Sequence, residues 1–458
     1  MTKTFDAQDT LPKLPIPELA DSLKHYARSV SVLQTPEEHA ATQKKIDSFL
    51  AHDGAALQEK LIEYAKDKNS FIEDFWYEAY FNYKASVVLN VNPFFVLEDD
   101  PTPSRANQVS RATSLIVSSL KFIHALRTET MKPDVWRTTP LCMNQFRMLF
   151  ATARCPTETN DAVQVAPNSK HIVIVCRNQF YWFDVMWEDG TAAITEREIM
   201  DNLRRIVDDA NSRPPATVSS SAVGVLTTEH RVSWAKLRKV LHQDNAETLA
   251  MIDRALFLVC LDHTSPPTAS DFASTALHGT YEIVQGHQVR KPTSRTGTCM
   301  NRWYDKLQII VCDNGVAGVN FEHSVVDGHT VLRFASDVFT DTVIRFAQSI
   351  SGTTQSFLTG AYRPPTDDLH IAPVRLEWTL NAELLQGIRF AEARLSDLIV
   401  QNQTRVLEFK TYGKSFITKH NCSPDAFVQI AFLAAYYLQY GTIVNQYEPA
   451  MTKRFLHG

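Results

Sequence analysis

The sequence lacks the features that mark several large classes of protein. Its 458 residues include only 15 glycines and seven scattered cysteines, and no two cysteines form a C-x-x-C pair. Without such pairs, or a Cys/His group at zinc spacing, we expect no structural metal and a reducing compartment. No apolar run approaches the length that crosses a bilayer, so we also expect no transmembrane segment.

A strong charge of either sign is also missing. The formal net charge is −5, which predicts no broad basic surface for nucleic acid or anionic lipid. A phosphate-bearing ligand would therefore need a local cluster of cations. The first twenty residues contain neither the apolar core of a signal peptide nor an Arg-rich amphipathic helix, and the final RFLHG is no peroxisomal signal. We expect a cytoplasmic protein, with mitochondria or peroxisomes as alternatives.

What the sequence does contain is a mixture of helix and strand patterns, in a chain long enough for two or three domains. Residues 103–129 have the apolar spacing of a long helix, and 86–92 (SVVLNVN) read as a strand. Two hairpins are predicted, over 170–187 and over 306–323, the second around an Asp-Asn-Gly turn. Helices mixed with hairpins predict a layered α/β or α+β architecture.

The segment 318–334, GVNFEHSVVDGHTVLRF, holds the best candidate for chemistry. An apolar strand ends near His323, then Asp327 and Gly328 follow, and an amphipathic helix begins. A strand end holds a side chain with little slack, an aspartate can fold back to fix the loop, and glycine permits a tight turn. An imidazole in that position can act as a general base near neutral pH. The alternative is a buried structural histidine followed by a helix-capping aspartate.

A second candidate is the basic segment that precedes the last long helix. Lys414, Lys419 and His420 stand just before Ser423 and Pro424, which form a strong N-cap and N1 pair. Side-chain charge next to a helix start could bind a phosphate; a solvated basic loop is the alternative. The residues expected on a buried face of this helix are Phe427, Ile430, Ala431, Ala434 and Leu438.

Segment 318–334 resembles the active-site segment of the carnitine/choline acyltransferase family, and its H-x-x-x-D-G is shared with CoA-dependent acyltransferases of the chloramphenicol acetyltransferase fold. Further blocks resemble the family in the family's order, among them 11–19 (LPKLPIPEL), 171–185, 301–311 and 406–455. The resemblance covers nearly the whole chain and is greatest to fungal carnitine acetyltransferases. It implies a two-domain α/β fold in which mixed sheets are flanked by helices.

The resemblance also implies the reaction. An acyl group, acetyl in the first place, would move between CoA and the hydroxyl of carnitine, with His323 as general base and Asp327 as the residue that positions it. No acyl-enzyme, metal or permanently bound cofactor is implied, since CoA and acetyl-CoA are substrates, and the protein would act as a monomer. Choline as acceptor, or a longer acyl chain, is the alternative within enzymes.

The CoA contacts implied by the resemblance lie in the basic segment. Lys414 matches a family lysine that holds the 3′-phosphate of CoA, and Asp425 matches an aspartate that contacts the pantetheine arm. The family's second lysine falls at Thr418 in this chain, so Lys419 would have to serve one residue later.

The carnitine contacts implied by the resemblance involve three aromatic residues. Tyr447, in NQYEPAM, matches a tyrosine that binds the carnitine carboxylate, although Pro449 replaces the usual serine. Trp76 and Tyr80 match residues that line the carnitine pocket, with a spacing one residue shorter than the family's. Ordinary core packing is the alternative for these aromatic side chains.

The family pattern predicts three segments: 1–75 as the arm and helices of a first domain, 76–378 as the catalytic-histidine domain, and 379–458 as a return to the first domain. In the family, residues that stabilise the oxyanion and select carnitine over choline follow the last of these segments. We therefore expect an incomplete domain with exposed apolar faces. The alternative to an enzyme is an inert truncated member or a CoA-binding remnant.

Overall fold

The computed structural model describes residues 3–102, 106–284, 294–351 and 369–458. None of the helices in these ranges is both long enough and apolar enough to cross a membrane. The chain divides into two compact units. The sheet unit comprises Met1–Asp6, Phe75–Pro133 and Met143–Val406, and the helical unit comprises Ala7–Asp74, Asp134–Cys142 and Leu407–Gly458.

A mixed sheet forms the centre of the sheet unit, in the strand order β1-β12-β11-β8-β6-β7-β13. Strands β6, β8 and β11 are parallel to one another, and the remaining neighbours pair antiparallel. This sheet and its helices confirm the predicted α/β class. The strands are β1 (Phe94–Val96), β6 (His171–Cys176), β7 (Gln179–Asp184), β8 (Leu258–Asp262), β11 (Gln308–Cys312), β12 (Ala317–Asn320) and β13 (Val374–Leu376).

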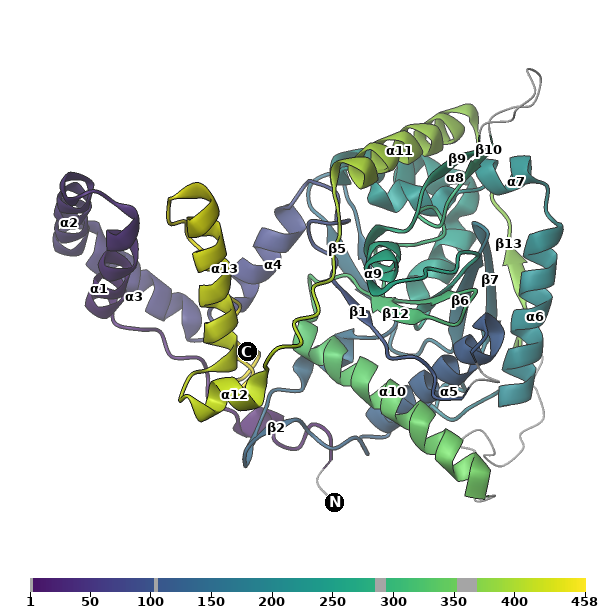
Figure 1. The fold of residues 1–458 in the computed structure, drawn as a ribbon, viewed down its shortest axis with the longest axis horizontal. Coiled ribbons are helices and arrows are strands. Elements are labelled where there is room, and N and C mark those ends of the chain that lie inside the picture. The colour runs from purple at the N-terminus through teal and green to yellow at the C-terminus, as the bar shows by residue number, and fades with distance from the viewer. Residues whose placement is uncertain (1–2, 103–105, 285–293, 352–368) are drawn as a thin grey trace. The chain divides into compact units, whose positions relative to one another are not determined.

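Helices cover both faces of this sheet (Figure 1). Alternate strand residues point to opposite faces, so Ile174 packs with the helices of one face and Val173 with those of the other. The first face carries α5 (Gln108–Arg127), α6 (Glu196–Ser212) and α10 (Gly328–Ser351). The second face carries α8 (Arg231–Arg254), α9 (Ala269–His278) and α11 (Ala382–Gln401).

The described residues also form shorter elements. They are the strand pairs β2/β3 (Val135–Trp136, Thr139–Pro140), β4/β5 (Thr152–Cys155, Ala162–Val165) and β9/β10 (Glu282–Val284, Ser294–Thr296). The short α-helices are α4 (Glu73–Asn82) and α7 (Pro215–Ser220). The 3₁₀ turns are η1 (Gln8–Thr10), η2 (Ser31–Leu33), η4 (Asn144–Met148) and η5 (Val223–Thr228).

Both predicted hairpins are confirmed, and the long helix predicted over 103–129 is found as α5, over Gln108–Arg127; residues 103–105 lie outside the described residues. In the β6–β7 turn, Arg177 and Asn178 have φ angles of 47° and 61°, the left-handed conformation that matches the twist of a two-residue hairpin. In the β11–β12 turn, Gly315 has φ 82°. Helix α5 begins behind Asn107, whose side chain accepts a hydrogen bond from the Ser110 amide.

The strand predicted over 86–92 is wrong. The amides of Val91 and Asn92 both donate to the Val87 carbonyl at 3.0 Å, and Leu89 has φ 65°, so the segment is a turn. Val87 and Val88 are fully buried. The apolar pattern there shows that the segment is buried, which can be true of a tight turn as well as of a strand. The strand of this region begins at Phe94, as β1.

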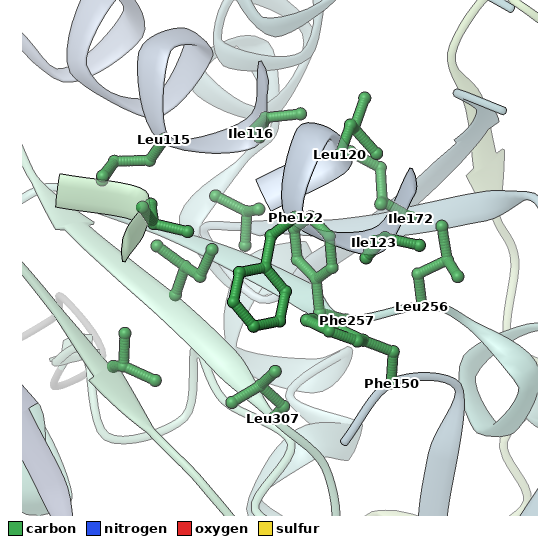
Figure 2. Close-up of a cluster of buried hydrophobic side chains, with 14 of the residues drawn as sticks. Leu115, Ile116, Leu120, Phe122, Ile123, Phe150, Ile172, Leu256, Phe257 and Leu307 are labelled. Carbon is green, nitrogen blue, oxygen red and sulfur yellow. The ribbon is translucent and has the colours of Figure 1, made fainter. Parts of the chain in front are cut away.

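Aromatic side chains fix α10 against the sheet. Phe334, in the second turn of α10, lies 5.4 Å from Phe122 of α5 and 5.2 Å from Phe150, between ring centroids. Figure 2 shows Phe122 and Phe150 gathered with Phe257 and the aliphatic residues of α5. Burial of such rings contributes on the order of 2–3 kcal/mol each. The start of α10, and the loop before it, are thereby held in place.

Two helices of the helical unit have side-chain caps, and few of the unit's side chains are buried. Thr35 and Glu38 form a capping box at the start of α2. Ser423 and Pro424 begin α13, and Gly441 ends it in the left-handed conformation. Its helices are α1 (Leu19–Val30), α2 (Pro36–Ala51), α3 (Asp53–Ala65), α12 (Lys414–Lys419) and α13 (Pro424–Tyr440).

The buried face predicted for α13 is wrong. None of its residues is buried, and the side chains of Ile430 and Leu438 are 64% and 84% exposed. Helical spacing shows which apolar residues share a face but not whether another element covers that face. The expectation of exposed apolar helix faces is confirmed for this helix.

Candidate active site

His323 lies where the sheet gives way to α10. Strand β12 ends at Asn320 and α10 begins at Gly328, so His323 stands in the loop 321–327. Its side chain is half-buried. The imidazole lies edge-on to Phe321 and to Tyr80 of α4, with ring centroids 5.9 and 5.8 Å away. The imidazole is therefore held between two aromatic rings and is still partly accessible to solvent.

A hydrogen bond to the main chain fixes which nitrogen of His323 can act as a base. Nδ1 lies 2.8 Å from the Val326 carbonyl oxygen. Because a carbonyl oxygen can only accept, Nδ1 must carry the hydrogen, and the neutral ring keeps its lone pair on Nε2. Nε2 is thus prepared to take a proton.

Asp327 is bound to Gln145 of η4. The Gln145 amide group donates to Asp327 Oδ2 at 2.6 Å, and the Gln145 side-chain oxygen accepts from the Asp327 amide at 2.7 Å. The same oxygen accepts from the Thr330 hydroxyl at 2.8 Å. The Asp327 carbonyl accepts the first amides of α10, from Thr330 and Val331. Asp327 therefore fixes the loop backbone that supplies the Val326 carbonyl.

Arg154 of β4 ties the residues on either side of His323 to α4. This guanidinium is buried. It donates to Glu322 Oε1 at 3.0 Å, to the Ser324 hydroxyl at 3.2 Å and to the Tyr80 carbonyl at 2.7 Å. Bonds in three directions leave the histidine loop little freedom relative to α4.

A chain of buried charges continues from Arg154. Asp161 Oδ2 accepts from both Arg154 and Arg231, each at 2.6 Å, and Arg231 also donates to Asp305 at 2.7 Å. The Trp234 indole donates to the second oxygen of Asp305 at 2.7 Å. Burial raises the pKa of Asp305, against the opposing effect of Arg231. Alternating charges of this kind are stabilising only while every partner is present.

Trp76 and Tyr80 do lie beside the histidine. Four residues apart on α4, they share a helix face, with ring centroids 4.7 Å apart. The Trp76 indole donates to the Ser324 carbonyl at 3.2 Å. Trp76 is 37% exposed, so the two rings form a partly open aromatic surface next to His323.

The other predicted residues lie in the helical unit. Lys414 and Lys419 are the first and last residues of α12, and both are exposed. Asp425, in the first turn of α13, shares a hydrogen bond with Glu448, which raises the pKa of Glu448. That contact places Asp425 near Tyr447, whose side chain is 81% exposed.

The structure thus groups the predicted residues into two sets, one in each unit. The sequence analysis missed Gln145, Arg154 and Val326. Gln145 is 182 residues from Asp327 along the chain, and no local pattern could reveal such a contact. In the described residues, no group of three or more His, Cys, Asp or Glu side chains is arranged to hold a metal ion.

Comparisons of this sequence with a family model and with individual proteins agree with one another. A model of the choline/carnitine O-acyltransferase family matches residues 14–458. A Saccharomyces cerevisiae protein provisionally named mitochondrial carnitine O-acetyltransferase is 41% identical, over 98% of this chain and 71% of its own length. Human carnitine O-acetyltransferase is 30% identical, over 98% and 68%. Mouse mitochondrial carnitine O-palmitoyltransferase 2 is 31% identical, over 99% and 69%.

Among solved structures, a chloramphenicol acetyltransferase matches with a TM-score of 0.27 and 10% identity, over 58% of this chain and 94% of its own. A likeness this weak supports no inference.

Proposed function

The chain belongs to the choline/carnitine O-acyltransferase family, and from that membership we propose that it transfers a short acyl group, acetyl first, between CoA and the hydroxyl of carnitine. The observation that carries the proposal is the His323 tautomer. With Nδ1 bonded to the Val326 carbonyl, the lone pair of Nε2 can accept a hydroxyl proton.

The proposed reaction is a direct transfer. Nε2 of His323 removes the proton from the carnitine hydroxyl as its oxygen attacks the thioester carbonyl carbon of acetyl-CoA. The tetrahedral intermediate collapses, the carbon–sulfur bond breaks, and the proton passes from the imidazolium to the departing thiolate. In reverse, Nε2 takes the proton of the CoA thiol. Since both half-steps use one nitrogen, no covalent acyl-enzyme is needed.

Substrate contacts follow from the resemblance and from exposure. We assign the 3′-phosphate of CoA to Lys414, with Lys419 as a second cation, because both ammonium groups are exposed at the two ends of α12. Asp425 is assigned to the pantetheine arm. In this proposal, CoA and acetyl-CoA are substrates and no cofactor stays bound.

Carnitine is assigned to aromatic residues. Tyr447 would bind its carboxylate, and Trp76 with Tyr80 would line its pocket. The position of Trp76 and Tyr80 next to His323 supports this assignment. A trimethylammonium group is attracted to aromatic faces of this kind.

A longer acyl chain is the second candidate substrate. It is favoured by the 31% identity to mouse carnitine O-palmitoyltransferase 2. The acyl length and the choice between carnitine and choline are therefore both put to the test below.

The test is a thiol-release assay with acetyl-CoA or palmitoyl-CoA, each with carnitine, with choline and without acceptor. We expect release with acetyl-CoA and carnitine, and a fall of about a thousandfold or more in His323→Ala. His329→Ala, which changes the exposed neighbour on α10, should retain activity. Substantial turnover by His323→Ala would refute the assignment. Binding of CoA without any turnover by the unaltered chain would favour the CoA-binding remnant instead.

The compartment and the oligomeric state are separate proposals. We propose a cytoplasmic monomer. Mitochondria and peroxisomes are the alternative locations, and the mitochondrial name of the yeast relative is the reason to test mitochondria. Imaging of the tagged protein and sedimentation of the purified one would test them.

A further inference from the structure

The β2–β3 hairpin of the helical unit carries a tryptophan on which two arginine side chains stack. Strand β2 is labelled in Figure 1, and Trp136 pairs with Thr139 across the hairpin. The guanidinium carbons of Arg137 and Arg454 lie over the Trp136 ring, 4.6 and 4.5 Å from its centroid. Trp136, Arg137 and Arg454 are called the arginine–tryptophan cluster below. The proposed acyl transfer uses none of them.

Both guanidinium groups of the cluster are available to a partner. Arg137 and Arg454 are exposed. Within the part of the chain that the structure describes, neither forms an ion pair or a hydrogen bond. The face of an indole attracts cations, and a guanidinium stacked on it keeps its N–H groups free for a carboxylate. The shared ring therefore holds two unpaired positive charges close together.

Buried contacts join the hairpin to the segment that carries Arg454. Lys453 and Asp134 are both buried, and Lys453 Nζ is 3.4 Å from Asp134 Oδ2. The Lys453 carbonyl accepts from the Cys142 amide at 2.6 Å, and the Asp134 carbonyl accepts from the Leu141 amide at 2.9 Å. The main chain beneath the cluster is thus already ordered, which reduces the entropy lost when a partner binds.

The turn of the hairpin holds an arginine in a backbone conformation that suits glycine. Arg137 has φ 57°, and this left-handed region costs free energy in residues that have a Cβ. Backbone strain of this kind is a reason to look for a function of the side chain that it presents. Here the strained residue presents one of the two unpaired guanidinium groups.

Apolar surface adjoins these charges. The side chains of Val135 and Trp136 are 60% and 41% exposed. Tryptophan and arginine are the residue types that most often contribute large binding energies at protein interfaces.

The charge of the whole chain favours a small partner surface. The formal net charge is −5, so the chain as a whole repels extended polyanions such as nucleic acids and anionic bilayers. The two arginines act locally, because charges are screened beyond roughly 8 Å at physiological salt. The cluster therefore suits a short acidic segment better than an extended anionic surface.

We propose that the arginine–tryptophan cluster is a docking surface for a short acidic segment of a partner protein. Carboxylates of that segment accept hydrogen bonds from Arg137 and Arg454. An apolar side chain next to the carboxylates packs on Val135 and the exposed part of Trp136. None of the residues assigned to CoA, to carnitine or to proton transfer belongs to this surface.

The test is fluorescence anisotropy of a labelled octapeptide of alternating glutamate and leucine, titrated with the intact chain. We expect saturable binding that weakens as salt is added. Arg454→Gln should weaken it about tenfold, the usual effect of losing a charge-assisted contact. Arg137→Gly should weaken it to a similar extent, and glycine adopts the turn without strain, so this variant removes the charge while the hairpin keeps its fold.

Two controls make the result specific. Arg205→Gln removes an exposed arginine of α6 and should bind the peptide as the unaltered chain does. The same octapeptide with glutamine in place of glutamate should bind at least about tenfold more weakly.

The proposal is overturned if the glutamate peptide does not bind, if the glutamine peptide binds equally well, or if Arg205→Gln weakens binding as much as Arg454→Gln. Vesicles that contain phosphatidylserine provide the last comparison. Binding to them through the same two arginines, and more tightly than to the peptide, would indicate a membrane surface and would also overturn the proposal. No outcome depends on thiol release, so the acyltransferase proposal stands or fails separately.

Discussion

The loop around His323 and the segment from Lys414 to Asp425 are held in place by very different means. In the loop, the side chains of Gln145 and Arg154 reach across more than 160 residues of sequence to bond with Asp327 and Glu322. In the segment, hydrogen bonds join residues that are close together in the sequence, such as the one that the Ala426 amide donates to the Ser423 hydroxyl. The proposed general base thus depends on contacts from distant parts of the sheet unit, whereas the proposed CoA contacts depend on local bonds within α12 and α13.

Burial follows the same division. The charged side chains of Arg154, Asp161 and Glu322 beside the histidine loop are buried, so their charges interact in a medium of low dielectric constant. The side chains of Lys414, Lys419 and Asp425 are exposed. Substitutions should therefore have large effects in the first region and small ones in the second.

The largest effect should come from Arg154→Met. Removing the guanidinium leaves Asp161 and Glu322 buried without this partner, which typically costs about 3–5 kcal/mol. Urea denaturation should show that loss in the free energy of unfolding. The control, Lys239→Met, breaks the exposed ion pair with Glu158 and should cost less than about 1 kcal/mol. Similar losses of unfolding free energy in the two variants would contradict the expected difference between buried and exposed charges.

Acid should weaken the sheet unit through His171. Burial lowers the pKa of this imidazole to about 4 from its usual 6.5, so the unfolded chain binds a proton at a higher pH than the folded one does. The resulting stability is complete above pH 6.5 and is lost as the pH falls towards 4, by up to about 3 kcal/mol. Urea denaturation at several pH values should show this slope. His171→Gln should reduce it, and an unchanged slope would contradict the assignment.

Gln145→Met should have a larger effect on turnover than on the free energy of unfolding. The variant releases Asp327 and the loop that carries the Val326 carbonyl, and a small misplacement of a base costs about 10- to 100-fold in kcat. Steady-state kinetics would measure this loss.

Asp327→Asn keeps an oxygen for the Gln145 amide group, so it should lose less turnover than Gln145→Met. If it loses as much or more, the charge of Asp327 acts on His323 directly, and the positioning by Gln145 is of secondary importance.

The smallest effect should come from Lys414→Ala. An exposed contact with the 3′-phosphate contributes about 1 kcal/mol or less, so the KM for acetyl-CoA should rise about fivefold at most. The KM for dephospho-acetyl-CoA should hardly change. Lys410→Ala, a nearby exposed lysine paired with Glu408, is the control. Equal rises for both substrates in Lys414→Ala would argue against the phosphate contact.

The sequence predicted what depends on neighbouring residues. The turn that requires positive φ, at Gly315, and the helix start at Ser423 are found where expected. These features are determined within a few residues, so their chemistry is visible in a short stretch.

Predictions that required knowledge of distant packing were less successful. The apolar residues of 86–92 form a buried turn, and those of α13 are exposed, because an apolar pattern does not say what covers it. The same reasoning explains the candidate site. His323 was recognisable from its own segment, whereas Gln145 and Arg154 become its neighbours only through the fold.

The partner of His323 Nδ1 has a bearing on mutational tolerance. Many catalytic histidines are oriented by a carboxylate, which a single base change in the gene can delete. Here the acceptor is the carbonyl of Val326, which every amino acid supplies at that position. Sequence drift at 326 can therefore alter packing without changing the tautomer of the ring, so directed evolution of this loop could proceed while the proposed general base keeps its lone pair on Nε2.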